Sequence, residues 1–346
     1  MPPEPSRGQL LAYLATIAAV GPLLAAAVIA LNFAVDPLWF GAGNRLGDRN
    51  LVYNERISKL NLFLQDPRAY DCAIFGDSRV SLLDPNRIEG HRCFNHAVAA
   101  ANLIDTGALA EFVAARSGRV ELVVLGLGLF NFADHPLPDH TPRFLQGLEE
   151  RAGAWQAYAS LPVALFSLES VLGNSRTPLY YRSDFTADIL DDPGAYDTNP
   201  ALAREAWDFF MTRGPFSTDE LPLLRRVQEA FPEARQLAYV PPVAADYIAE
   251  LARAGTLESY LDVIFAISRQ VEALHDFSIP SETTADPSRT LDGQHFLRST
   301  NDRVAAVLSG SRVGFGVPVH TLDRASYGAA YRAALARFTE VGDAAL

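Results

Sequence analysis

The 346-residue chain is poor in cysteine, with only Cys72 and Cys93, and it has no run of lysines and arginines. Because no Cys or His pairs stand at zinc-ligand spacing, we expect neither a structural zinc site nor another bound metal. Lys and Arg total 29 against 41 Asp and Glu, a formal net charge of -12. Such a chain repels phosphate backbones, so nucleic-acid binding is not expected. No motif calls for a cofactor.

Charge is also absent from residues 10–35, which are almost entirely apolar. About 20 apolar residues span a bilayer, whereas the apolar region of a cleavable signal peptide has roughly 7–15. The length favours an uncleaved anchor, although Val-Ile-Ala at 28–30 also fits a cleavage site. The short tail, residues 1–9, carries Arg7 and is predicted to be cytoplasmic. We therefore expect a single-pass protein of the inner (cytoplasmic) membrane, held in the lipid bilayer by residues 10–35, with an extracytoplasmic domain.

Beyond the anchor, short apolar segments alternate with helical patterns. Strands are expected at 72–75, 92–98, 120–127, 235–240 and around Phe277, and helices at 106–116 (capped by Asp105) and 299–308, among others. This alternation predicts an α/β fold, a three-layer sandwich with a central parallel sheet and helices on both faces. We expect a connector and first helix at 36–68, and one α/β domain at 69–346 with a helical insertion at about 134–231.

The two cysteines each begin an expected strand. If those strands are parallel neighbours, Cys72 and Cys93 lie at the same end of both, about 4.8 Å apart, within the range that a disulfide tolerates. An extracytoplasmic domain permits oxidation. Two buried free thiols are the alternative, and the sequence leaves both open.

A candidate nucleophile follows the first expected strand of the soluble part, in the segment Gly76-Asp77-Ser78. Sites of parallel α/β sheets form beyond the carboxyl ends of the strands. Gly76 permits a tight turn, and we expect a helix to start after it, with backbone N–H groups that stabilise an anion. Ser78 can attack a carbonyl carbon if a neighbouring base takes its proton.

A base of this kind is present near the other end of the chain, in Asp292-Gly293-Gln294-His295. In a loop before a helix, both side chains can face one point. The carboxylate would fix the tautomer of the imidazole, and His295 would act as general base.

Together the two motifs resemble the SGNH/GDSL hydrolase-like superfamily, over roughly residues 50–310. The layout is similar to a membrane-anchored bacterial group that includes the D-alanyl transfer protein of teichoic-acid modification and alginate O-acetyltransferase-like proteins. Further segments that carry this resemblance are Asn54–Leu64 with Arg56 and Lys59, Tyr239-Val240-Pro241-Pro242, and Asp276-Phe277-Ser278. The resemblance implies an SGNH (flavodoxin-like) fold, with Ser78 as nucleophile and oxyanion N–H donor and Asp292 and His295 as its triad partners.

Two blocks depart from the family pattern. The second block, normally Asn-x-Gly-x-x-Gly, reads Asn95-His96-Ala97-Val98-Ala99-Ala100, so Ala100 replaces a glycine oxyanion donor. The third block has Gly128 where an asparagine is normal, and Asn131 follows three residues later as a possible substitute. Losing one oxyanion donor costs about 10²–10³ in rate, so the sequence permits a slow or degenerate enzyme.

Two further residues are candidates for substrate binding. Arg79 can orient a substrate carboxylate or phosphate, or form a structural salt bridge. Asp276, at the end of the last expected strand, can contact substrate or cap a turn. His96 is expected to be a core histidine.

Three functions are compatible with these residues. The first is an extracytoplasmic O-acyltransferase that moves an acyl group, typically acetyl, through Ser78 to a cell-envelope glycan and receives it from a multi-pass membrane acyltransferase. The second is a membrane-tethered esterase that hydrolyses an acyl ester with the same triad. The third is a non-catalytic glycan-binding or assembly protein with an incomplete oxyanion hole.

Overall fold

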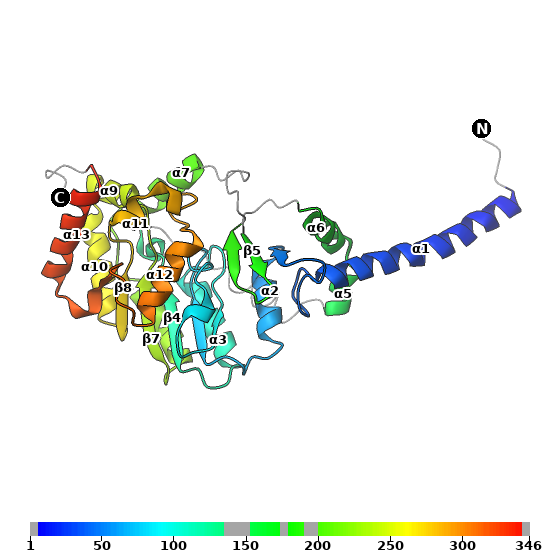
Figure 1. Ribbon diagram of the computed structural model, residues 1–346, viewed down its shortest axis with the longest axis horizontal. Helices are drawn as coiled ribbons and strands as arrows, with labels where there is room; N and C mark the ends of the chain where they lie inside the picture. The colour runs from blue at the N-terminus through cyan, green and yellow to red at the C-terminus, as the bar shows by residue number, and fades with distance from the viewer. Residues whose placement is uncertain (1–5, 135–152, 174–178, 190–199, 341–346) are drawn as a thin grey trace. The chain divides into compact units, whose positions relative to one another are not determined.

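The computed structural model describes residues 6–134, 153–173, 179–189 and 200–340 (Figure 1). The chain forms two compact units. Unit 1 combines Met1–Leu62 with Glu150–Phe185, and unit 2 combines Phe63–Glu149 with Thr186–Leu346.

Unit 1 is built on one long helix, α1 (Arg7–Val35). Its 29 residues reach a mean hydropathy of 2.4 in the most apolar window, so α1 is long and apolar enough to cross a membrane. The other elements of unit 1 are β1 (Arg49–Leu51), α2 (Glu55–Phe63, which ends at the boundary with unit 2), α5 (Ala154–Tyr158), α6 (Leu161–Val171) and β5 (Leu179–Arg182). Strands β1 and β5 pair antiparallel.

Unit 2 contains a six-stranded sheet in the order β3-β2-β4-β7-β8-β9. All neighbours are parallel except β8 and β9. The strands are β2 (Cys72–Phe75), β3 (Cys93–Asn95), β4 (Leu122–Gly126), β7 (Arg235–Val240), β8 (Ala273–Asp276) and β9 (Val317–Pro318). The prediction of a mainly parallel α/β sheet is therefore confirmed.

The inner strands β2 and β4 are buried on both faces of the sheet, which explains why they read as continuous apolar runs. Every residue of β2 and β4 is buried. On one face, Ile74 and Val124 share a core with Val304 of α12 (Arg298–Leu308). On the other face, Phe75 lies with its ring centroid 5.9 Å from that of Phe231, which caps α8 (Leu224–Ala230).

The remaining elements of unit 2 connect or follow the strands. They are η1 (Pro85–Arg87), α3 (Leu103–Ala114), η2 (Leu129–Phe132), β6 (Ala187–Ile189), α7 (Pro200–Met211), η4 (Leu221–Leu223), α9 (Ala245–Arg253), α10 (Leu257–Ser268), α11 (Glu282–Ala285), η5 (Pro287–Arg289), η6 (Val319–Thr321) and α13 (Arg324–Phe338). Helices α9, α10 and α13 contact one another and lie together in Figure 1.

Two details differ from the sequence-based expectations. Helix α3 begins at Leu103 because the Asn102 side chain accepts the N–H of Asp105, so Asn102 is the cap and Asp105 lies inside the helix. The expected insertion at 134–231 is divided, since Glu150–Phe185 belongs to unit 1 and the part from Thr186 onward to unit 2. Residues 135–152, 174–178 and 190–199 of that insertion lie outside the described residues.

Cys72 and Cys93 are directly opposite each other in the parallel pair of β2 and β3, as the shared strand position predicts. Their Cα atoms are 4.2 Å apart and the two sulfurs are bonded. The structure therefore contains the disulfide and not two free thiols.

We expect the Cys72→Ala/Cys93→Ala variant to be less stable by about 3 kcal/mol, because the bond closes a loop with a sequence separation of 21 and restricts the unfolded chain. Urea unfolding of the purified full chain measures this difference. Dithiothreitol should lower the stability of the original protein and leave the variant unchanged. Equal unfolding midpoints for the original protein and the variant, both without dithiothreitol, would contradict the prediction.

Candidate active site

Ser78 lies three residues after the end of β2, at the carboxyl edge of the sheet. Gly76 makes the tight exit possible, since a Cβ there would be 2.5 Å from Val80 Cγ2 and 2.9 Å from the Gly126 carbonyl oxygen. The chain then forms turns, in which the Val80 N–H donates to the Asp77 carbonyl, and not the helix start that the sequence suggested. Ser78 remains partly exposed.

The structure brings the three predicted catalytic residues together. Ser78 Oγ is 2.8 Å from His295 Nε2, although 217 positions separate them in the sequence. His295 Nδ1 is 2.7 Å from Asp292 Oδ2. With Nδ1 protonated and bonded to the carboxylate, Nε2 is the basic nitrogen and accepts the Ser78 hydroxyl proton. This is the geometry of an activated serine nucleophile with an oriented base.

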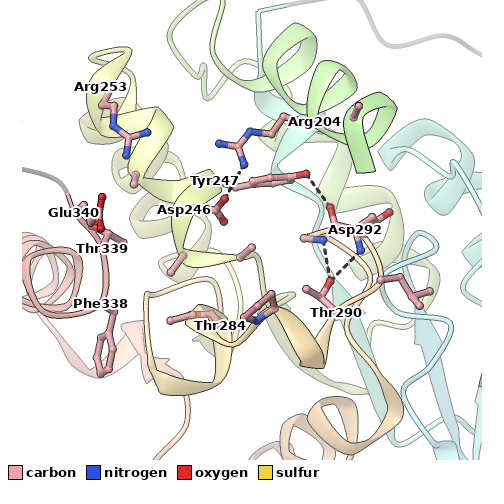
Figure 2. Close-up of a pocket in the computed structure, with 18 residues that line it drawn as sticks. Arg204, Asp246, Tyr247, Arg253, Thr284, Thr290, Asp292, Phe338, Thr339 and Glu340 are labelled. Carbon is pink, nitrogen blue, oxygen red and sulfur yellow. Dashed lines mark hydrogen bonds and ion pairs between the residues drawn. The ribbon is translucent and has the colours of Figure 1, made fainter. Parts of the chain in front are cut away.

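The loop that holds Asp292 and His295 is closed by short-range hydrogen bonds. Thr290 Oγ1 accepts the N–H of Gly293 at 2.9 Å and donates to the His295 carbonyl at 3.0 Å. The hydroxyl of Tyr247, on α9, donates to the Asp292 carbonyl at 2.8 Å, as Figure 2 shows. Gly293 has φ +87°, and a Cβ there would be 2.8 Å from the Tyr247 ring. Only glycine fits this position without strain.

Thr290 and Tyr247 were not identified from the sequence. Thr290 stands two residues before Asp292. A threonine hydroxyl often forms a turn by bonding to the backbone two or three residues further on, so the sequence could have indicated this role. Tyr247 lies 45 positions away from Asp292, and no local pattern marks it.

The carboxylate of Asp292 is held in its ionised form. Burial alone raises the pKa of this group, but the hydrogen bond and charge of His295, with the backbone N–H groups of Gln294 and His295, together lower the pKa to about 2. The two N–H groups donate to Oδ1 at 2.9 and 2.8 Å, which leaves Oδ2 for the imidazole. Asp292 therefore stays negative at every pH where His295 can act as base.

Because the folded pKa of Asp292 is about 2, below its ordinary value, this carboxylate stabilises the folded protein above about pH 4. That contribution, on the order of 2 kcal/mol, is lost as the pH falls from 4 to 2. We expect Asp292→Asn to remove this part of the pH dependence. Urea unfolding of both proteins between pH 2 and 6 is the measurement, and identical slopes between pH 4 and 2 would contradict it.

Two of the expected oxyanion donors have free N–H groups. Beyond the strands, His96 donates to the Ile74 carbonyl and Val98 to the Gly76 carbonyl, so the second segment keeps running beside the first. This pairing ends at Gly76 and Val98, two residues before Ser78 and Ala100 in the sequence. Within the described part of the chain, neither the Ser78 N–H nor the Ala100 N–H has an acceptor.

Ala100 adopts the left-handed conformation that glycine favours, with φ +57°. For a residue with a Cβ this costs on the order of 1–2 kcal/mol. The backbone of this alanine thus has a conformation that a glycine adopts without strain.

Asn131 is buried and its carboxamide is bound to backbone. Its Oδ1 accepts the N–H of Leu103 at 2.9 Å, and its Nδ2 donates to the Gly128 carbonyl at 2.7 Å. One hydrogen of Nδ2 remains, but these bonds give the side chain a clear structural role, which joins η2 to the start of α3.

Gly128, the second departure from the family pattern, has a physical reason. A Cβ at this position would be 1.9 Å from Arg79 Nη2 and 2.3 Å from Asp77 Oδ2. The space of the missing side chain is therefore filled by the Asp77–Arg79 ion pair.

Arg79 forms the salt bridge that was one of its two predicted roles. Its Nε is 3.1 Å and its Nη2 is 2.5 Å from the two carboxylate oxygens of Asp77, and both side chains are buried. Burial alone would lower the pKa of Arg79, but the Asp77 charge raises it, so the guanidinium stays protonated. Within the described residues its Nη1 has no hydrogen-bond acceptor.

Asp276 is not part of this site, which corrects its expected substrate contact. The residue has 0% exposure. Its Oδ1 accepts from the backbone and hydroxyl of Ser278, and its Oδ2 accepts from the Tyr327 hydroxyl at 2.6 Å. A carboxylate with these partners caps the turn after β8, the alternative that the sequence also offered. His96 is likewise in the core, stacked on Phe75 with ring centroids 5.3 Å apart.

A cavity of about 910 Å³ lies against the outer side of the Asp292–Gly293 loop, next to Tyr247 and Arg204 (Figure 2). Arg204, on α7, donates to Asp246 and covers the Tyr247 ring. Neither Ser78 nor His295 lines this cavity, so its size does not describe the acyl-binding space.

Among the described residues no group of three or more His, Cys, Asp or Glu side chains is placed to hold a metal ion. Searches for related proteins identified no matching family model and no similar curated protein.

Proposed function

We propose that the protein is a membrane-anchored serine acyl-transfer enzyme, and the observation that carries this proposal is the continuous relay Ser78–His295–Asp292. The Ser78 hydroxyl is within hydrogen-bond distance of an imidazole, and that imidazole is bonded to an ionised carboxylate. This arrangement lies beyond the carboxyl end of a strand, where parallel α/β sheets place their active sites, and it is the arrangement that activates a serine nucleophile.

The reaction follows the usual two steps of serine acyl transfer. Ser78 Oγ attacks the carbonyl carbon of an acyl ester while His295 Nε2 takes the hydroxyl proton. The N–H groups of Ser78 and Ala100 stabilise the negative oxygen, and the C–O bond to the leaving alcohol breaks as His295 returns the proton to it. An acceptor hydroxyl then attacks the acyl carbon as His295 takes its proton; the ester bond to Ser78 Oγ breaks, and His295 returns the proton to Oγ.

The anchor helix supports transfer, rather than hydrolysis, as the main reaction. With α1 in the inner membrane and the domain outside the cytoplasm, the site can receive acyl groups, typically acetyl, from a multi-pass membrane acyltransferase and pass them to a hydroxyl of a cell-envelope glycan. The triad, the parallel sheet covered on both faces and the single N-terminal apolar helix support membership of the SGNH/GDSL superfamily with its three-layer architecture.

Hydrolysis is the second candidate, and one observation favours it. The His295 side chain is 34% exposed, so water can reach the base. With water as acceptor, the same intermediate yields a free carboxylic acid.

The test uses the detergent-purified full chain with p-nitrophenyl acetate, with and without an oligosaccharide acceptor, and mass spectrometry of the protein. A 42-dalton acetyl adduct (the mass of C₂H₂O, from the chemistry of acetylation) on the peptide that contains Ser78 supports the proposal. Acetylated oligosaccharide supports transfer, and acetate release without acceptor supports hydrolysis. The adduct should be absent from Ser78→Ala and present in Ser81→Ala. The second variant is the matched control, because Ser81 is a buried serine three residues away. Folded protein that never carries an adduct on Ser78 would overturn both enzymatic functions.

A further inference from the structure

Helix α6 exposes a row of large apolar side chains. Its leucines recur at the spacing of one helical face, i, i+4, i+7 and i+11, over about 16 Å. The exposed fractions are 67% for Leu161, 66% for Leu165, 47% for Leu168 and 64% for Leu172. The helix has a second face that is buried, with Val163, Ala164 and Ser167. On a helix that faces water, the exposed face normally carries polar residues and not a row of leucines.

The buried face of α6 is fixed to the end of α1. Asn32 of α1 has 0% exposure and donates to the carbonyls of Tyr158 and Ser160 at 2.8 and 3.0 Å. Ser167 of α6 donates its hydroxyl to Asn32 Oδ1 at 2.9 Å. Figure 1 shows α5 and α6 beside the end of α1 that is remote from the N-terminus. These bonds hold α6 at one height along the anchor.

The length of α1 places Asn32 near a membrane surface if the helix crosses a bilayer. Twenty residues of α1, from Leu10 to Ile29, rise about 30 Å, the thickness of the hydrocarbon core. Asn32 follows within about 5 Å of this limit. Residues 8–27 of α1 are exposed over their whole length, whereas contacts with the rest of unit 1 begin at Val28. If α1 crosses the bilayer, α6 is therefore held near the end of the membrane-spanning part of the anchor.

Trp155, on α5, is a second exposed apolar feature of this part of unit 1. It is 68% exposed, whereas Trp39 and Trp207 are almost fully buried. Tryptophan gathers at membrane interfaces, where its ring meets the acyl chains and its N–H meets the headgroups.

We propose that α5 and α6 form an interfacial foot, defined as Trp155 with Leu161, Leu165, Leu168 and Leu172, that is immersed in the outer leaflet of the bilayer crossed by α1. Its ligand is the glycerol and upper acyl region of phospholipids, the layer that amphipathic helices enter by about 5–10 Å. The inference rests on α1 crossing the bilayer, and it goes beyond the proposed acyl transfer.

The full chain is reconstituted into phosphatidylcholine/phosphatidylglycerol vesicles whose acyl chains carry bromine near the headgroup. Trp155 emission is obtained as the difference between the protein and its Trp155→Phe variant. We expect bromolipid to quench most of this emission and aqueous iodide to quench little of it. In Leu165→Asp/Leu168→Asp the two sensitivities should exchange. Leu202→Asp, a change at a leucine of α7 that is 61% exposed, should alter neither.

Alkaline carbonate washing separates the possible failures. Retention in the membrane together with iodide-sensitive, bromolipid-insensitive Trp155 would overturn the interfacial foot and leave the anchor intact. Protection from both quenchers would assign the face to a protein partner or a second copy, and would also overturn it. Release by carbonate would overturn the anchor and the foot together. None of these results affects the adduct on Ser78.

Discussion

Replacing His295 with alanine is expected to slow acetyl-enzyme formation by about 10⁴–10⁶-fold, because Ser78 Oγ then has no base to take its proton. The bond that disappears is the 2.8 Å contact with Nε2. Residual reaction would come from the backbone N–H groups near Ser78 and from substrate binding alone. Single-turnover kinetics with p-nitrophenyl acetate measures the effect directly, since the burst reports acylation.

The triad also predicts strong non-additivity. The residual rate of p-nitrophenolate release by Ser78→Ala/His295→Ala should equal that of Ser78→Ala, because the two groups act as one unit. His91→Ala serves as the control. His91 precedes β3, at the end of the sheet away from Ser78, and its Nδ1 is 3.6 Å from Asp71 Oδ1. A His295→Ala protein that retains the original burst rate would exclude His295 as the base.

Gly128→Asn, which would restore the residue of the family pattern, is expected to damage the protein rather than improve it. The new Cβ would meet Arg79 Nη2 at 1.9 Å and Asp77 Oδ2 at 2.3 Å, so the ion pair must separate. Breaking a buried pair leaves uncompensated charge and costs about 3–5 kcal/mol. Asp77 precedes Ser78 directly, so we expect the acylation rate to fall together with the free energy of unfolding.

Thermal unfolding and the burst rate of the same sample test this prediction. Gly118→Asn is the matched control, because a Cβ at Gly118 would have only ordinary contacts, the nearest at 3.7 Å. If Gly128→Asn were as stable as the original protein and faster in acylation, Arg79 would have to leave the site easily, and the explanation for Gly128 would be refuted.

The middle of the sheet was predictable because β2, β4 and most of β7 are short apolar segments that are buried. Strands β2 and β7 occupy the same residues, 72–75 and 235–240, as the sequence indicated. The start of α3 was misplaced because Asn102 and Asp105 are both good caps, and only the fold decides which side chain faces the first free N–H groups. The grouping of Glu150–Phe185 with the N-terminal segment rests on contacts between distant residues, which no local pattern encodes.

For the site, the sequence indicated the three candidate catalytic residues, which the structure brings together, and missed the residues that support them. Ser78, Asp292 and His295 were identified because each stands in a short motif, Gly-Asp-Ser or Asp-x-x-His. The place of Arg79 beside Gly128 was not foreseeable, since it depends on which side chain fills a gap left by another. For Asp276 the sequence left substrate contact and turn cap both open, because a carboxylate at a strand end looks the same in sequence whether it faces solvent or, as here, a buried tyrosine.

The Cys72–Cys93 bond has a consequence for the far end of the same two strands. β3 is the edge strand of the sheet and has only three residues, so few hydrogen bonds prevent it from slipping along β2. The cross-link fixes residue 72 opposite residue 93, and the later contacts of the two segments, up to the bond between the Val98 N–H and the Gly76 carbonyl, follow in the same register. Oxidation of the two thiols therefore constrains, from the far end of the strands, the path of the two segments that lead to Ser78 and Ala100.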